Sequence, residues 1–402
     1  MRPFAGEVAP ALEARVAEAW MSLLGQADAI ADDICLSLLE KDAELYERTG
    51  PEFQVDVRAS TRDHIRRGIE AMAGVPNSTH QTAELWRETG RRRARQGIPM
   101  ELVLNAYTLG TRVLWEALLA QGAHDNVDEQ VLLVAGQRVW SALDVQNAVF
   151  IEAYRRESVR LQRRDLHRQQ STLDALVEGR GADPDFATEA REVLGIGPEM
   201  AVACVVAPYD GSLDEPLITP TDRLERHGLV SHWHVRGGLY FGLLAGDHLP
   251  RDADLVTLLA PLATGRAAVA SSPDGMAGFA TAFQLAARAT DTVPVGTRAA
   301  VAVSQRLPEV LLAGNPEVAA LLVRETVAPI LAQPPHVADT LRQTLAALLE
   351  HDGSAKHAAE ALYCHRNTVI YRAKQIEELT GRSLSDPRDK LLLSLGLLAA
   401  PG

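Results

Sequence analysis

The chain has 402 residues, of which 47% are hydrophobic and 23% are charged, and its formal net charge is −13. This length predicts two to four domains of roughly 100–200 residues each, and the composition excludes disordered and fibrous classes. The acidic balance also predicts weak non-specific attraction to polyanions.

The three cysteines, Cys35, Cys204 and Cys364, are odd in number and far apart in the sequence. This usage indicates reduced, structural thiols in a cytosol, and neither a disulfide framework nor a zinc cluster. The most apolar segment, residues 391–400, is about half the ~20 residues that a helix needs to span a bilayer, and no secretory signal pattern is present. We expect a cytoplasmic protein with no membrane partner.

Residues 10–179 have a helical pattern throughout, with breakers confined to short stretches, and predict an all-α domain. His64 and His80 have no partner at ligand spacing, so we assign no cofactor and no metal. Four tryptophans are expected in the core of this domain, with a ligand pocket as the alternative: Trp20, Trp86, Trp115 and Trp140.

The same pattern predicts one long helix over residues 128–178, which contains no proline or glycine after Gly136. Its segment EAYRRESVRLQRRDLHR carries six arginines against three acidic residues. We interpret this segment as a solvated helix face, with a signalling coiled coil or contact with a DNA backbone as alternatives. The apolar positions do not keep a strict heptad.

Beyond Pro184 the periodicity changes to that of an α+β or α/β domain. We expect strands at residues 200–207, 229–235, 239–245, 267–270 and 299–303, and helices at 254–262, 276–289 and 316–331. Pro329, Pro334 and Pro335 indicate a linker between this domain and the final one. His232 and His234 share one face of a predicted strand, but no third metal ligand follows at the usual spacing.

The last segment predicts three helices. The first spans residues 337–351, and the second and third are short helices joined by a tight turn. Gly353 is placed to end the first helix, and Ser354 to cap the second. In the third helix, Val369, Ala373, Ile376 and Leu379 recur at helical spacing and should face the core. This arrangement is typical of a helix-turn-helix that reads DNA.

The outward residues of the third helix suit the chemistry of the major groove. Arg366 can bind guanine at two points, Asn367 can do the same for adenine, and Thr and Tyr reach phosphate or a thymine methyl. Arg372 has two alternatives, a phosphate contact or an internal pair with Glu377 or Glu378. We predict that seven residues contact DNA: His365, Arg366, Asn367, Thr368, Tyr371, Arg372 and Lys374. Residues 337–402 carry eight basic and eight acidic residues. Contacts with DNA phosphates alone would therefore bind this segment weakly.

The motif HRNT-V-x-YR-x-x-x-IEELTG, complete from His365 to Gly381, resembles the C-terminal helix-turn-helix of the PucR family of bacterial transcription regulators. The resemblance covers about the last 65 residues. It implies a sequence-specific regulator that binds double-stranded operator DNA.

Residues 199–331 are similar in strand and helix order to the degenerate GGDEF-like domain of that family, which implies a ferredoxin-like fold. Leu239 and Tyr240, in RGGLYF, stand where a cyclase has two carboxylates for its metal. If the alignment holds, the domain makes no cyclic dinucleotide, and otherwise Gly237–Gly238 is only a hairpin turn. Residues 90–118 are similar to the globin-like N-terminal domain of RsbR stressosome proteins, which implies a sensor or interaction role without naming a ligand.

We therefore expect a helical sensor or interaction domain at residues 1–150, a linker helix at 151–185, a GGDEF-like domain at 186–332 and an all-α helix-turn-helix domain at 333–402. No catalytic constellation is assigned, and we expect a regulator that is not an enzyme. We expect it to act as a homodimer or higher homo-oligomer, modulated by a small-molecule effector or a partner. The alternative is a signalling scaffold that acts by protein contact through the RsbR-like domain.

Overall fold

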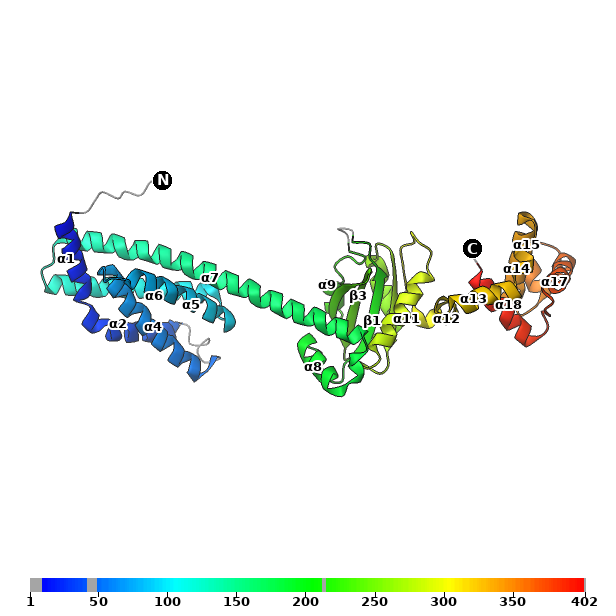
Figure 1. Cartoon of the computed structure of the whole chain (residues 1–402), viewed down its shortest axis with the longest axis horizontal. Helices are drawn as coiled ribbons and strands as arrows, with labels where there is room; N and C mark the ends of the chain where they lie inside the picture. The colour runs from blue at the N-terminus through cyan, green and yellow to red at the C-terminus, as the bar shows by residue number, and fades with distance from the viewer. Residues whose placement is uncertain (1–8, 42–48, 212–214, 401–402) are drawn as a thin grey trace. The chain divides into compact units, whose positions relative to one another are not determined.

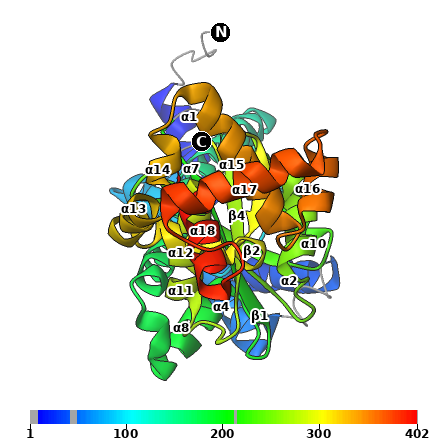
Figure 2. The same ribbon diagram turned by 90° about the vertical axis from the view of Figure 1, so that its right-hand side faces the viewer.

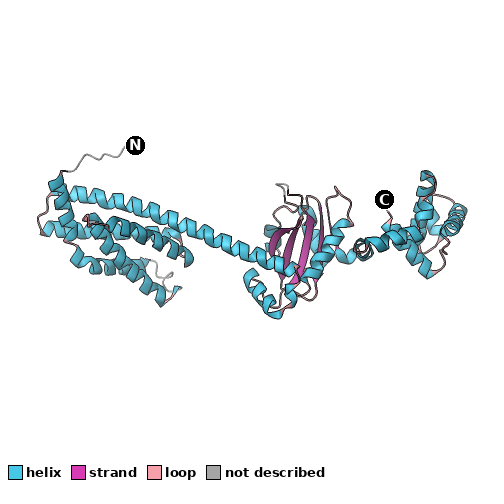
Figure 3. Cartoon of the chain, in the orientation of Figure 1, coloured by secondary structure: helices cyan, strands magenta, loops and turns pink. Residues whose placement is uncertain are grey.

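The computed structural model describes residues 9–41, 49–211 and 215–400. The chain divides into two compact units, Met1–Leu166 and His167–Gly402 (Figure 1). Helices dominate both units, and the strands, magenta in Figure 3, all belong to the second. Within the described ranges, no helix combines the length and the apolar character that crossing a membrane requires.

The described part of the first unit is helical, as the sequence predicts. Its helices are α1 (Pro10–Met21), η1 (Leu24–Gln26), α2 (Ala27–Lys41), α4 (Pro51–Met72), α5 (Ser78–Arg95), α6 (Met100–His124) and the start of α7 (Glu129–Val177). Trp20, Ile69 and Leu118 are almost fully buried in its core. Trp115 is partly buried against the same cluster. The expectation for Trp140 was wrong, because 45% of this side chain is exposed.

Helix α7 confirms the prediction of one long helix, and it contributes residues to both units. In the first unit Phe150 is fully buried, and Glu157 is buried between the guanidinium groups of Arg95 and Arg160 at 2.8 and 2.7 Å. In the second unit Leu173 and Leu176 pack into the core of the sheet. A single uninterrupted helix therefore supplies core side chains to two domains.

The second unit holds a five-stranded sheet with the order β2-β3-β1-β4-β5. Its strands are β1 (Ala201–Pro208), β2 (Val230–Arg236), β3 (Leu239–Gly246), β4 (Arg266–Ser272) and β5 (Ala299–Ala302). All neighbours are antiparallel except β4 and β5, which are parallel. The five predicted strands are therefore confirmed to within a few residues, and Gly237–Gly238 forms the β2–β3 turn.

Alternate residues of β1 face opposite sides of the sheet, and each side has its own core. Val202, Cys204 and Val206 pack with Phe279 and other residues of α11 (Phe279–Asp291). Ala203, Val205 and Ala207 belong to the other core, with side chains from two further helices, α9 (Pro220–Glu225) and α10 (Asp252–Leu259). The central strand is thus covered on both faces, which explains its continuous apolar sequence. The remaining elements around the sheet are η2 (Arg180–Ala182), α8 (Pro184–Leu194), η3 (Ala260–Leu262) and η4 (Val303–Gln305).

The rest of the second unit is helical (Figure 2). It comprises α12 (Leu307–Ala313), α13 (Pro316–Glu325), α14 (Ala328–Leu331), α15 (Pro335–Glu350), α16 (Ala355–Ala361), α17 (Arg366–Thr380) and α18 (Pro387–Ala399). The prolines expected in a linker lie at helix starts instead: Pro329 in the first turn of α14 and Pro335 in the first turn of α15. Proline suits these positions because first-turn N–H groups have no partner within the helix.

Candidate nucleic-acid interface

Helices α15, α16 and α17 are positioned by caps that the sequence encodes. Gly353 follows α15 with a φ of +82° and donates its N–H to the Leu348 carbonyl at 2.7 Å, a left-handed conformation that favours glycine. Ser354 Oγ accepts from the His357 N–H at 3.4 Å, and His365 Nδ1 accepts from the Asn367 N–H at 3.2 Å. Both predicted ends, after α15 and before α16, are therefore confirmed.

One side of α17 is fixed in the core. Val369 and Ile376 have no exposed surface, and Ala373 and Leu379 are partly buried against the same clusters. These are the four positions that the helical spacing assigns to the interior. Their burial orients the helix, because the other positions must then point away from the packed clusters.

The opposite side of α17 is exposed to solvent. Arg366, Asn367 and Lys374 are exposed, and Tyr371 has 71% and Ile370 has 45% of its surface exposed. The first N–H groups of α17 add partial positive charge at the end where Arg366 and Asn367 lie. The helix therefore presents two-point hydrogen-bonding side chains beside a helix N-terminus.

Three of the predicted contact residues have a second, structural role or are less exposed. His365 is exposed, but its ring nitrogen caps α17. Thr368 is partly buried. Arg372 is also partly buried, and its guanidinium lies 3.5 Å from Thr344 Oγ1. Glu377, one of the pairs considered for Arg372, instead accepts the Leu384 N–H at 2.8 Å.

Some basic side chains of residues 337–400 form ion pairs with acidic neighbours, whereas others on α16 and α17 do not. Arg382 pairs with Asp389 at 2.9 Å, Lys390 with Asp352 at 3.1 Å, and Arg342 with Asp339 at 3.7 Å. Residues 337–400 are described without a gap, and within them no salt bridge engages the three basic residues of α16 and the exposed side of α17: Lys356, Arg366 and Lys374. A neutral domain can thus offer local positive charge on its helix-turn-helix.

Tyr363, in the turn between α16 and α17, is a residue that sequence reasoning missed as a candidate contact. It is 97% exposed and has a φ of +50°. Such a conformation is uncommon for a bulky residue and marks strain, a tight turn or a functional position. The sequence predicts a tight turn before the third helix, but it gives no signal that Tyr363 is exposed there.

The β2–β3 hairpin carries Leu239 and Tyr240, the two residues that stand where a cyclase has carboxylates. Leu239 packs against a core cluster, and Tyr240 stacks on Trp233 with ring centroids 5.1 Å apart. His232 Nε2 lies 2.7 Å from the Leu194 carbonyl, and His234 Nε2 lies 3.3 Å from Asp174. Among the described residues, no group of three or more His, Cys, Asp or Glu is arranged to hold a metal ion.

The fold and this surface define a multidomain protein with a helical N-terminal domain, a mixed α/β domain and a C-terminal helix-turn-helix. Three family profiles match in that order: the RsbT co-antagonist protein rsbRD N-terminal domain at residues 28–169, a GGDEF-like domain at 178–292, and the PucR C-terminal helix-turn-helix domain at 341–399. The C-terminal domain therefore resembles the PucR helix-turn-helix, and it follows an RsbRD-like and a GGDEF-like domain.

Curated relatives match different parts of the chain. An uncharacterised protein of Mycobacterium tuberculosis is 27% identical over 240 residues, which are 57% of this chain and 56% of the relative. The purine catabolism regulatory protein of Bacillus subtilis is 43% identical over 67 residues (17% of this chain and 13% of the relative). The carbohydrate diacid regulator of Escherichia coli is 46% identical over 57 residues (14% and 15%). The chain thus matches little more than half the length of the first relative, and only the C-terminal parts of this chain match the other two.

Proposed function

We propose that the protein is a sequence-specific DNA-binding transcription regulator whose helix α17 enters the major groove of an operator. The observation that carries this proposal is the division of α17 into two sides: Val369 and Ile376 are buried, while Arg366 and Asn367 are exposed at its N-terminus. The names of the relatives that match the helix-turn-helix, both regulators, support the same class. We further propose a cytoplasmic location and modulation by a ligand or partner through the preceding domains.

The recognition helix is tested by Arg366→Ala and Asn367→Ala. Each variant should fold normally, because both side chains are exposed, and should lose ~1–3 kcal/mol of specific binding while relaxing one operator position. Binding is measured by gel shift against the promoter beside the protein's own coding sequence. Arg324→Ala is the matched control, since this arginine on α13 is 72% exposed outside the motif. Unchanged affinity and sequence preference in both variants would contradict the assignment of α17 as the recognition helix.

We also propose that the GGDEF-like domain is not a cyclase and that its topology is ferredoxin-like. The strand order β2-β3-β1-β4, with antiparallel neighbours, supports the topology. Leu239 and Tyr240 provide no carboxylate at the hairpin where a metal would be held. Full-length protein incubated with GTP and Mg²⁺ should yield no cyclic dinucleotide by chromatography, beside an active cyclase as control. Turnover that disappears when the hairpin is changed would contradict this.

A second candidate function is a signalling scaffold that acts by protein contact. The match of residues 28–169 to the N-terminal domain of an RsbT co-antagonist protein favours it. The gel shift separates the two candidates: a scaffold whose DNA-binding end is secondary would regulate its partner without needing Arg366 or Asn367.

A further inference from the structure

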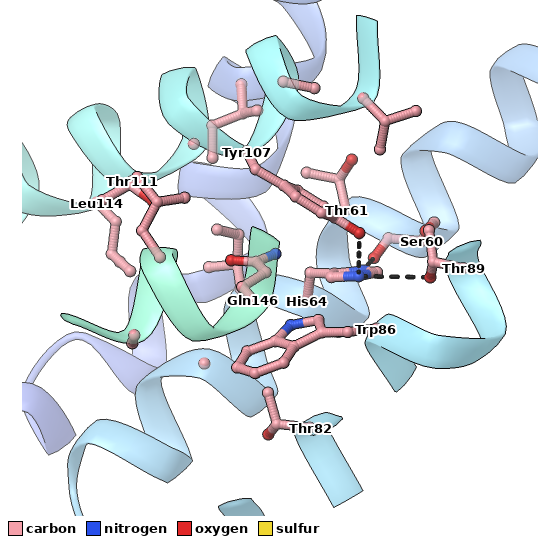
Figure 4. Close-up of a pocket in the computed structure, with 18 of the residues that line it drawn as sticks. Ser60, Thr61, His64, Thr82, Trp86, Thr89, Tyr107, Thr111, Leu114 and Gln146 are labelled. Carbon is pink, nitrogen blue, oxygen red and sulfur yellow. Dashed lines mark hydrogen bonds between the residues drawn. The ribbon is translucent and has the colours of Figure 1, made fainter. Parts of the chain in front are cut away.

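The first unit contains a cavity of about 390 Å³ that is lined by α2, α4, α5, α6 and α7 (Figure 4). Most of the lining is apolar and includes Ile34, Phe53, Ile65, Trp86, Leu114 and Val139. Sites for small molecules have this size and character, with a few polar groups that fix orientation. The cavity also explains why Trp86 is only partly buried: its indole is part of the wall.

The polar part of the wall centres on His64 of α4. Its Nδ1 lies 2.7 Å from the Ser60 carbonyl oxygen, which can only accept, so Nδ1 carries the hydrogen and Nε2 is an acceptor. Nε2 lies 3.4 Å from both Thr89 Oγ1 and Tyr107 Oη. The Thr89 hydroxyl already donates to the Leu85 carbonyl at 2.9 Å. The Tyr107 hydroxyl can therefore donate to Nε2 only through a long hydrogen bond of 3.4 Å. O–H donors normally approach an acceptor to about 2.5–3.0 Å, so a ligand hydroxyl could make a shorter bond to Nε2 in its place.

The charges around the cavity favour an uncharged occupant. Burial, the largest effect, lowers the pKa of His64 to about 4, so this ring is neutral at physiological pH. Among the described residues that line the cavity, only Arg93 has a charged side chain. Its guanidinium is bound to Asp56 and Gln96, each at 2.6 Å, and lies over the Phe53 ring. The cation is therefore already neutralised and held by its own partners.

We propose that this cavity binds a small neutral molecule of one or two rings, largely apolar, that donates a hydrogen bond from a hydroxyl group to Nε2 of His64. Trp86 lies beside His64 in the close-up (Figure 4) and offers an aromatic surface to such a ring. Binding in the cavity depends on the geometry of the first unit alone. Its use as an effector site rests on the proposed function as a DNA-binding regulator.

Helix α7 gives the cavity a covalent path to the rest of the chain. Gln146 and Val139 of α7 line the cavity, and Leu173 and Leu176 of the same helix pack in the core of the sheet. A ligand that changes the packing around Gln146 acts on an element shared by both units. Occupancy of the cavity should therefore alter DNA affinity only if the proposed function is correct.

The binding test uses the full-length protein and three probes of the same ring size: 2-naphthol, naphthalene and 2-naphthoate. Calorimetry should show 2-naphthol bound about tenfold more tightly than naphthalene, the difference that one hydrogen bond of about 1.4 kcal/mol produces. The anionic 2-naphthoate should bind more weakly than 2-naphthol. Equal affinity for 2-naphthol and naphthalene would overturn the role of His64. Tightest binding of 2-naphthoate would overturn the neutral class, and no binding of any probe would overturn the site.

Two variants locate the binding within the cavity. Gly68 of α4 lines the cavity, and a Cβ built there meets nothing within 4 Å, so Gly68→Leu should fill the space and weaken 2-naphthol at least about tenfold. His64→Phe keeps a ring but removes the acceptor, and should abolish the preference for 2-naphthol over naphthalene. Gly25→Leu is the control, because this position also has room but lies outside the lining. Binding unaffected by Gly68→Leu would place the probe elsewhere and refute the proposal.

The gel shift keeps this proposal distinguishable from the proposed function. If the wild-type protein binds 2-naphthol as expected but no operator, the cavity assignment stands and the regulator assignment fails. If it binds the operator but no probe, the reverse holds.

Discussion

His64 shows how the surroundings of one side chain set its charge. In solution its imidazole would have a pKa near 6.5, whereas burial beside the cavity lowers the pKa to about 4, assisted by Arg92 and Arg93. The hydrogen bond to the Ser60 carbonyl and the charge of Asp63 oppose this effect but are smaller. The unfolded chain therefore takes up a proton between about pH 6.5 and pH 4 that the folded protein does not.

This difference predicts a pH dependence of folding. Because the unfolded state binds more protons in this window, the free energy of unfolding should fall as the pH decreases from about 6.5 to about 4, by at most about 3 kcal/mol. Below about pH 4 His64 should cause no further loss. His64→Gln should flatten this part of the profile, measured by urea denaturation at a series of pH values. A variant with the same slope as the wild type would show that other groups cause it.

Glu157 acts in a different window and serves as an internal reference. Hydrogen bonds from Arg160 and then Arg95 lower the pKa of this buried carboxyl to about 2. Its stabilising effect is present above its unfolded pKa of about 4.5 and is lost as the pH falls towards 2. The His64→Gln substitution should leave that more acidic limb of the profile unchanged.

At the scale of elements, the contact between α13 and α18 depends on one glycine. A Cβ at Gly396 of α18 would lie 2.0 Å from Thr326 Oγ1 and 3.1 Å from Thr326 Cβ, just beyond α13. Thr326 is buried, and its hydroxyl donates to the Leu322 carbonyl at 2.5 Å. The side chain of Thr326 therefore has little room to move away.

We predict that Gly396→Ala destabilises the second unit by about 1–3 kcal/mol through overpacking. Urea denaturation of the full-length protein measures the loss. Gly265→Ala, where a Cβ meets nothing within 4 Å, is the matched control. Adding Thr326→Ala to Gly396→Ala should recover part of the loss, because the two sites are coupled. Additive effects of the two substitutions would contradict the direct clash.

At the scale of the whole molecule, we predict that the protein binds DNA as a dimer or higher homo-oligomer. A neutral helix-turn-helix gains little from phosphates, so two copies on half-sites about 34 Å apart, or a multiple of that, would supply the missing affinity. Sedimentation at micromolar concentration should show at least a dimer. A monomer in solution with one protein per operator would exclude this assembly.

The exposed leucines of α18 are the first surface to test for pairing. Leu391 and Leu398 have 58% and 50% of their surfaces exposed, and the long helix α7 also exposes Val159 and Leu166. Replacing both leucines of α18 with Gln should weaken self-association by at least about tenfold, if pairing buries them. Val295→Gln, at a position that is 85% exposed in a loop, should have no effect.

The order of the elements and the two sides of α17 could be predicted from the amino-acid sequence alone. Apolar residues at helical spacing identified Val369 and Ile376 as interior, and alternating or continuous apolar runs located all five strands. Glycine and N-cap residues located the helix ends at Gly353 and Ser354. These features were predictable because they depend on local periodicity and on backbone conformations that few residue types adopt.

The contacts between polar residues that are distant in the sequence became known from the three-dimensional packing of the helices. His64 looked like an isolated histidine in the sequence, yet Thr89 and Tyr107, from two other helices, come to its Nε2 beside a cavity. Trp140 had the pattern of a core residue but is exposed, and Arg372 contacts Thr344 from another helix. Such contacts depend on how helices pack over long sequence separations, and local spacing carries no information about that packing.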